Sequence, residues 1–294
     1  MISFFLTLGL LTFSTHNSTY NDDLMLTYEG ETIATINHDA FTSSLIDIPI
    51  MNENMLEQLI TKLEQQINEA PLNAYINERN ELISGRPGYQ LDRDTFTQKL
   101  YTYFLHHHPL ELEIPTKTVH PRVSSELLAD IHVKQIGSYV TYYNTNKSQR
   151  ATNIFLAAEA INNHVVFQGE VFSFNEVVGK RTTEKGYLPA PIIIKGELYD
   201  GVGGGICQVS STLFNAVDKA GVKIVQRYSH SRRVPYVPPG RDATVSWYGP
   251  DFTFKNVYNQ PILIRASAKH GRLVITIYSS DAINTSSTAI DTTN

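Results

Sequence analysis

The sequence predicts an α+β protein, because segments with helical spacing alternate along its 294 residues with segments that have the spacing of strands. Apolar residues recur every three or four positions from Met55 to Ile67 and again from Val209 to Ala220. Strand-like runs close the chain at 252–256, 262–266 and 273–278. A hydrophobic content of 41% over this length is enough for a proper core and favours two domains.

The N-terminal half, 20–125, is expected to be a small α+β region. Its predicted strands are 28–37, 74–76 and 110–114, and its predicted helices are 55–67 and 91–104. A Gly/Pro turn at 85–88 precedes the second helix, and Pro109 ends it.

The second half is expected to form a domain over 132–279, after a linker at 116–125 and a short helix at 126–131. Its predicted elements are a helix at 151–161, a turn and strand at 169–175, a helix from Cys207 to Gly221, a strand at 222–230 and the three closing strands. In a regular strand, His230 would share a face with Val222, Ile224 and Tyr228. The Ser/Thr-rich tail, 280–294, is predicted to be disordered.

Charge and glycine spacing argue against nucleic-acid and nucleotide partners. The net charge is -5, the pI is near 6.1, and no long Lys/Arg cluster is present. Arg227, Arg232 and Arg233 with Tyr228 and Tyr236 form a local basic-aromatic patch, expected to be a substrate-facing or solvated surface. Gly201 to Ile206 lacks the third glycine of a dinucleotide fingerprint, and no Lys-Ser/Thr follows. No cofactor is predicted.

Metal sites and disulfides are also not expected. A single cysteine excludes an intramolecular disulfide and a zinc site of paired cysteines. The run His106-His107-His108 is predicted to be a helix-end cluster, because adjacent histidines point in different directions and no ligand lies nearby at suitable spacing.

The first residues, 1–19, are a candidate signal peptide. Ile2 to Phe13 is apolar but too short to span a bilayer comfortably, and the chain then turns polar. However, no Lys or Arg precedes this run and no clear cleavage site follows it; a buried N-terminal strand and a truncated start are the competing interpretations. The prediction is an extracytoplasmic or cell-wall location, with membrane contact only through this leader.

The run Gly203-Gly204-Gly205-Ile206-Cys207-Gln208 places the only cysteine at the start of a helix. Glycines without side chains would let a substrate approach the unpaired N–H groups of the first helical turn, which could hold an oxyanion. The helix N-terminus also favours the thiolate. A packing cysteine is the alternative, although the helical wheel puts Cys207 opposite the apolar stripe, beside Ser211 and Phe214.

Catalytic partners of this thiol are sought among the residues that follow. His230 is the candidate base, Asp242 could orient its ring, and Arg241 could bind a substrate carboxylate. A structural histidine and a loop salt bridge between Arg241 and Asp242 are the alternatives. Ser210 and Ser211 are rival nucleophiles and candidate substrate-binding residues, but hydroxyls in a first helical turn commonly bond to backbone and no serine-enzyme signature is present.

These segments occur in an order that resembles the VanW-like domain over about 136–278. The motifs are Gly169 to Asn175, Gly179 to Thr182, Gly186-Tyr187, Gly203 to Thr212, Arg227 with His230, Pro239 to Thr244, and Asp251 to Asn256. Gln168 departs from the pattern, since a proline commonly precedes the Gly-Glu turn. The segment 71–121 resembles a peptidoglycan-binding module found upstream of cell-wall enzymes.

The resemblance implies a mainly antiparallel sheet with packed helices and a role in the bacterial envelope. Some VanW-like proteins look like L,D-transpeptidases whose nucleophile is the cysteine equivalent to Cys207, acting on peptidoglycan stem peptides. The usual His-Gly-Cys signature of such enzymes is not present here. The alternative is a noncatalytic accessory protein that binds peptidoglycan or a glycopeptide.

Overall fold

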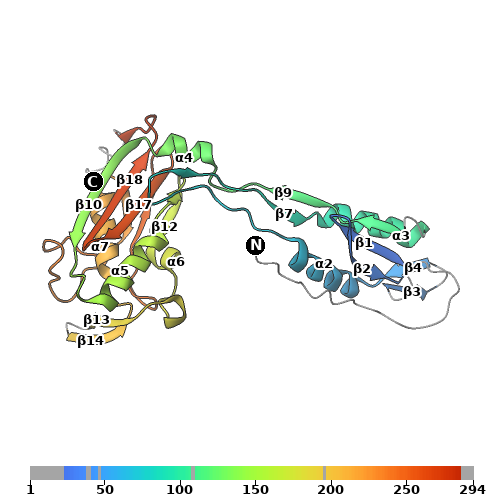
Figure 1. The fold of residues 1–294 in the computed structure, drawn as a ribbon, viewed down its shortest axis with the longest axis horizontal. Coiled ribbons are helices and arrows are strands. Elements are labelled where there is room, and N and C mark those ends of the chain that lie inside the picture. The colour runs from blue at the N-terminus through green and yellow to red at the C-terminus, as the bar shows by residue number, and fades with distance from the viewer. Residues whose placement is uncertain (1–22, 38–40, 46–47, 107–109, 195–196, 286–294) are drawn as a thin grey trace, which may run out of the picture. The chain divides into compact units, whose positions relative to one another are not determined.

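The α+β fold is confirmed by the computed structural model, which describes residues 23–37, 41–45, 48–106, 110–194 and 197–285 (Figure 1). The described chain divides into two compact units: one takes in residues up to 73 and 85–122, the other 74–84 and 123 onward. No helix within the described ranges is both long and apolar enough to cross a bilayer. The candidate leader, 1–19, lies outside the described residues.

The first unit combines a three-stranded sheet with two helices. β1 (Leu24–Tyr28) pairs antiparallel with β2 (Glu31–Ile36) and parallel with β8 (Glu111–Glu113). The predicted single strand 28–37 is wrong at its start, because Glu29 and Gly30 both have positive φ and turn the chain into a hairpin.

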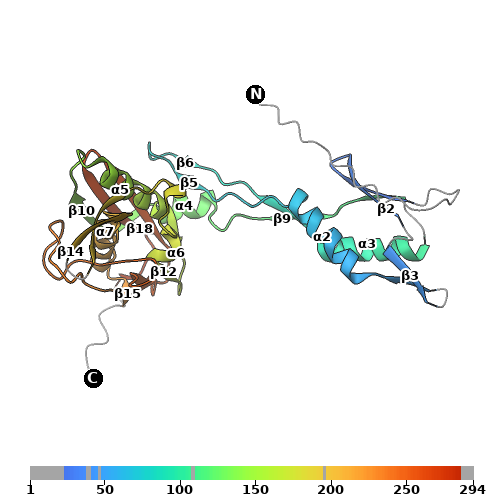
Figure 2. The same ribbon diagram turned by 90° about the horizontal axis from the view of Figure 1, so that it is seen from below.

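Helices α2 (Glu53–Ile67) and α3 (Arg93–His106), which can be followed in Figure 2, agree with their apolar spacing. The side chain of Asn52 caps α2 by accepting from the N–H groups of Asn54 and Met55. Both helices contribute to one core with the sheet. Shorter strands complete the unit: β3 (Thr42–Leu45) pairs with β4 (Ile48–Met51), and β7 (Gly88–Leu91) with β9 (Thr116–Val119).

Residues 74–84 belong to the second unit, whereas the sequence placed them inside the region 20–125. They form β5 (Tyr75–Ile76) and β6 (Leu82–Ile83). The side chain of Asn163 holds them, accepting from the N–H of Ile76 at 2.9 Å and donating to its carbonyl at 3.0 Å. The segment predicted to be one module, 71–121, is thus divided between the units, and peptidoglycan binding by it stays a prediction.

The second unit is organised around an antiparallel sheet with strand order β10-β18-β17-β11. Figure 1 shows three of these strands side by side: β10 (Lys134–Tyr142), β18 (Arg272–Ser279) and β17 (Ile262–Lys269); β11 is His164–Val166. Alternation along β17 divides the core. Ile262 and Ile264 face the cluster of helices α5 (Ser148–Ile161) and α7 (Ile206–Lys219), and Leu263 faces α4 (Ser125–Ile131) and β5.

Smaller elements surround α7. β12 (Val171–Ser173), β16 (Thr253–Lys255) and β15 (Lys223–Gln226) form a second sheet, with α6 (Phe174–Val178) after β12. A 3₁₀ turn at Thr183–Lys185 precedes the hairpin β13 (Pro189–Ile194) and β14 (Glu197–Val202).

Two sequence-based boundaries need correction here. The strand predicted for 222–230 ends at Gln226, and Arg227 to His230 form irregular backbone, so alternation does not decide where His230 points. The tail predicted to be disordered from 280 begins as ordered chain, since Ile283 is buried in the main core. Residues 286–294 lie outside the described residues.

Candidate active site

The glycine turn before α7 is packed against protein. Gly203 and Gly205 have φ values of +89° and +111°, in the region that glycine adopts without strain. A Cβ on Gly204 would lie 2.3 Å from the carbonyl oxygen of Ala190, and the buried amide of Asn153 donates to the Gly204 carbonyl at 2.9 Å. The expectation that three bare glycines open the loop to a substrate is therefore wrong for Gly203 and Gly204, which are buried. They allow close packing of the turn.

The N–H groups of this helix start are partly used. Those of Ile206 and Gln208 donate to the carbonyls of Gly203 and Gly205, at 3.2 and 3.0 Å. The N–H of Cys207 has no hydrogen-bond partner among the described residues, so it is a donor at this turn that an oxyanion could use.

Helix α7 is buried on nearly every side. The apolar stripe from Val209 to Ala220 faces the core as predicted, but Ser211 and Phe214, on the side of Cys207, are buried too. Cys207 itself is partly exposed. Cys207 lies opposite the apolar stripe as the helical wheel predicted, but it also packs against the main core, and its neighbours on that side are buried.

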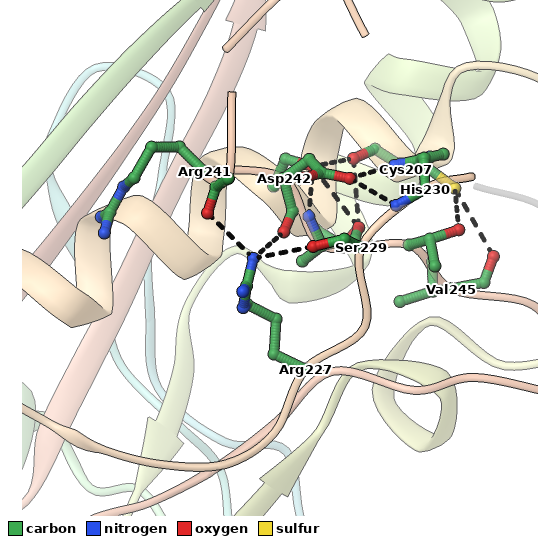
Figure 3. A network of polar contacts seen from close by, with 12 residues as sticks. Cys207, Arg227, Ser229, His230, Arg241, Asp242 and Val245 are labelled. Carbon is green, nitrogen blue, oxygen red and sulfur yellow. Dashed lines mark hydrogen bonds and ion pairs between the residues drawn. The ribbon is translucent and has the colours of Figure 1, made fainter. Parts of the chain in front are cut away.

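His230 and Asp242 lie next to Cys207, as Figure 3 shows. One carboxylate oxygen of Asp242, Oδ2, accepts from the backbone N–H of His230 and is bonded to its Nδ1, both at 2.6 Å. The side chains of His230 and Asp242 are only 5% and 10% exposed. Since Nδ1 is taken by Asp242, Nε2 is the ring atom left for the thiol.

This arrangement favours a thiolate and an imidazolium. Burial by itself would raise the pKa of Cys207, but the hydrogen bond and charge of His230 outweigh it, and the pKa lies below its usual value. Burial works against the charged ring of His230 in the same way, and contacts with Cys207 and Asp242 raise its pKa. Burial would likewise raise the pKa of Asp242, yet hydrogen bonds from His230 lower it. The two shifts of Cys207 and His230 belong to one coupled pair.

Two hydroxyls of α7 hold the segment that carries Asp242. Ser210 Oγ donates to the carbonyl of Ala243 at 2.6 Å, and Ser211 Oγ accepts from the N–H of Ala243 at 2.9 Å. Ser211 Oγ also donates to the carbonyl of Cys207 at 2.6 Å. Ala243 lies between Asp242, which contacts His230, and Thr244, whose Oγ1 is 3.8 Å from the sulfur. The serines, predicted as substrate-binding residues, are buried and fix the geometry of the site instead.

Gln208 and Arg241, also predicted to bind substrate, have partners within the protein. Gln208 is buried, accepts from Arg150 at 2.8 Å and donates to Thr141 and Tyr142 at 3.0 Å. Arg241 donates to Asn215 and Asp218, at 2.7 Å each. The alternative salt bridge between Arg241 and Asp242 is not what the structure has, since Asp242 faces His230 and Arg241 pairs with Asp218.

The basic-aromatic patch is split by the fold. Arg227 donates to the backbone carbonyls of Gly240 and Asp242, at 3.1 and 2.6 Å, and so supports the same loop (Figure 3). Arg232 and Arg233 are exposed. Tyr236 is partly buried near Cys207, and burial raises its phenol pKa.

Sequence reasoning assigned no role to Arg150 and Arg181, although both lie near the thiol. The pKa of each guanidinium is lowered by burial, and a negative charge on Cys207 acts to raise it again. Arg181 stands in the Gly179 to Thr182 motif, which was the available signal. Within the described ranges, no three His, Cys, Asp or Glu side chains are grouped as metal ligands would be.

Comparison with known proteins matches these features to one family. A family model described as VanW like protein matches residues 149–278, which include Cys207, His230 and Asp242. The protein YoaR of Bacillus subtilis (strain 168) is 56% identical over 263 residues, covering 90% of this chain and 87% of YoaR. The chain belongs to the VanW-like family. The resemblance predicted from the spaced motifs is confirmed.

Two further similarities are more limited. The vancomycin B-type resistance protein VanW of Enterococcus faecalis (strain ATCC 700802 / V583) is 31% identical over 105 residues, which cover 34% of this chain and 38% of that protein. A solved structure of the Ldtfm-avibactam carbamoyl enzyme aligns with 62% of this chain and 70% of its own, at 10% identity and a TM-score of 0.24. At that TM-score the likeness carries no argument about this VanW-like chain.

Proposed function

We propose that this protein is a cysteine-dependent acyl transferase of the bacterial cell envelope, similar to L,D-transpeptidases, that acts on peptidoglycan stem peptides. One observation carries the proposal: Cys207, His230 and Asp242 lie in the order that nucleophilic catalysis requires, thiol to imidazole to carboxylate. An extracytoplasmic or cell-wall location belongs to the same proposal, since peptidoglycan lies there.

In the acylation step, the thiolate of Cys207 attacks the carbonyl carbon of the scissile amide in the donor stem. A C–S bond forms, and the carbonyl oxygen takes up the negative charge beside the N–H of Cys207. The C–N bond then breaks as the imidazolium of His230 gives its proton to the departing amine. Asp242 keeps the ring oriented and stabilises its positive charge before that transfer.

In the second step, the amine of another stem attacks the thioester. The new C–N bond replaces the C–S bond, His230 accepts the proton that the amine loses, and the thiolate of Cys207 leaves. Water in place of the amine would hydrolyse the thioester, which would make the same site a carboxypeptidase.

The rival function is noncatalytic binding of peptidoglycan or a glycopeptide. This alternative is suggested by the Enterococcus faecalis relative, which is named a vancomycin B-type resistance protein. The geometry favours catalysis, because a site that only binds has no need of a thiol whose pKa is lowered by a carboxylate-oriented imidazole.

The test uses the single cysteine. The protein is incubated with a stem tetrapeptide or a carbapenem, and intact mass followed by peptide mapping locates any adduct. We expect a covalent adduct on Cys207 and crosslinked dimers from stems in a reconstituted assay, both lost in Cys207→Ala. The matched control is Ser231→Ala, which replaces an exposed serine on the loop that follows His230 and should behave as wild type. Folded protein without adduct, or full crosslinking by Cys207→Ala, would refute the enzymatic proposal.

A further inference from the structure

An arginine side chain packs close to each of Gly203 and Gly205. A Cβ built on Gly203 would lie 2.9 Å from Cδ1 of Ile206 and 3.3 Å from Cβ of Arg181, and one on Gly205 would lie 2.9 Å from Cγ of Arg150. Both contacts are closer than side chains ordinarily accept at such positions. The missing side chains therefore make room for two arginine stems against the turn that leads into Cys207.

The guanidinium of Arg181 is buried without a hydrogen-bond partner. Both terminal nitrogens, Nη1 and Nη2, are shielded from solvent and bond to none of the described residues. The guanidinium lies over the ring of Phe174, with 5.7 Å from Cζ to the ring centroid. A buried positive charge without a partner lowers the stability of the folded protein, so the position of Arg181 near Cys207 suggests that the charge has a function.

The surrounding charges point to the thiol as its counterpart. The groups that face Arg181 are Tyr187, Cys207 and Asp251. The carboxylate of Asp251 is occupied elsewhere, since it accepts from Ser173 Oγ at 2.6 Å and from the N–H groups of Asn175 and Phe252 at 2.9 and 2.7 Å. A thiolate on Cys207, although it also contacts His230, is then the negative charge near Arg181 that has fewer such donors.

Arg150, on helix α5, lies beside the helix turn that carries the same thiol. Its Nη2 donates to Gln208 Oε1 at 2.8 Å, which fixes the guanidinium beside the first turn of α7. The groups that face it are Tyr236, whose phenol stays neutral because burial raises its pKa, and Cys207. Around Cys207 itself, His230 lowers the thiol pKa most strongly, and the two arginines are further positive charges that interact with it.

We propose that Arg181 and Arg150 supply positive potential that adds to that of His230 and stabilises the Cys207 thiolate. Arg181 acts through its field, because its terminal nitrogens are shielded from direct contact with a reactant. Neither arginine moves a proton in the reaction. Both add to the effect of His230 on the charge state of the sulfur.

This inference rests on the proposed function, but its test does not require turnover. Because Cys207 is the only cysteine, alkylation of the whole protein measures that thiol alone. The alkylation rate with iodoacetamide, measured from pH 5 to 10, gives the thiol pKa. The ratio of the iodoacetate rate to the iodoacetamide rate reports the local electrostatic potential, because iodoacetate carries one more negative charge. The variants are Arg181→Met and Arg150→Met, with Arg272→Met, an exposed arginine of the same unit, as the charge-matched control.

We expect Arg181→Met to raise the thiol pKa by about one unit and to lower the ratio of iodoacetate to iodoacetamide rates several-fold. Arg181→Lys, which keeps the charge, should stay near the wild-type pKa. Arg272→Met should change neither quantity.

An unchanged thiol pKa and reagent ratio in folded Arg181→Met would overturn the inference. Should that variant not fold, Arg181→Gln provides the same comparison with a polar side chain. A thiol pKa that depends on Arg181 in a protein that forms no adduct with stem peptide would uphold the inference and refute the proposed function. Crosslinking with a thiol pKa independent of Arg181 would do the reverse.

Discussion

Replacing Ser211 by alanine should destabilise the second unit and disturb its thiol together. Ser211 Oγ donates to the carbonyl of Cys207 at 2.6 Å and accepts from the N–H of Ala243 at 2.9 Å. Ser211 and Ala243 are both fully buried. Losing the first bond costs about 1 kcal/mol, and leaving the N–H of Ala243 unpaired in the interior costs about 1–3 kcal/mol more. We expect the free energy of unfolding to fall by about 2–4 kcal/mol.

The same change should reach the thiol through the backbone. Ala243 fixes its neighbours Asp242 and Thr244, so a looser Ala243 weakens the hold of Asp242 on His230. The thiol pKa of Ser211→Ala should therefore rise toward the usual value of about 8.5. Both effects can be measured on one preparation, by thermal unfolding followed with circular dichroism and by the pH dependence of iodoacetamide alkylation.

The matched control is Ser231→Ala, because Ser231 is exposed on the loop that follows His230. Its stability should stay within about 0.5 kcal/mol of wild type. If Ser211→Ala unfolded at the wild-type temperature with the wild-type thiol pKa, the two hydrogen bonds of Ser211 would not be holding the segment that carries Asp242.

Three further predictions concern charge and the placement of 74–84. The rate of Cys207 alkylation should fall on the acid side of a thiol pKa that lies below about 8.5, and the rate of transpeptidation should be bell-shaped in pH. The alkaline limb of that bell reports loss of the His230 proton and should lie above about pH 6.5. A transpeptidation rate that rises as a single sigmoid near pH 8.5 would contradict the ion pair of Cys207 and His230. Because the pKa of Asp242 is lowered in the folded protein, its ionised carboxylate stabilises the fold fully above about pH 3.9, and this contribution is lost as pH falls through the lower folded pKa. By urea unfolding, Asp242→Asn should therefore be less stable than wild type by about 1.5–3 kcal/mol at pH 7 and as stable as wild type in acid. Asn163→Ala should release Ile76, so amide hydrogen exchange over 74–84 should become faster while the thiol pKa of Cys207 stays the same. Unchanged exchange over 74–84 would show that apolar packing holds this segment instead.

Local signals were sufficient for most helices and for the position of Cys207 at the start of one. The spacing of Met55 to Ile67 predicted α2, and the glycine run predicted that Cys207 begins a helix. Local signals were insufficient where a segment is held by residues far away in the sequence. The strand assigned through His230 stopped at Gln226, and 74–84 joined the second unit through Asn163, because these outcomes depend on contacts 12 and 87 residues away along the chain.

By itself the sequence determined the family, the α+β class, the identity of the cysteine and the residues that could serve it, since motif order and apolar periodicity are properties of neighbouring positions. Tertiary structure alone decided what those residues do. It turned Ser210, Ser211 and Gln208 into supports, and it packed Gly203 and Gly205 against two arginines. The physical reason is that burial and pairing fix a polar side chain's role, and both arise only when distant segments pack together.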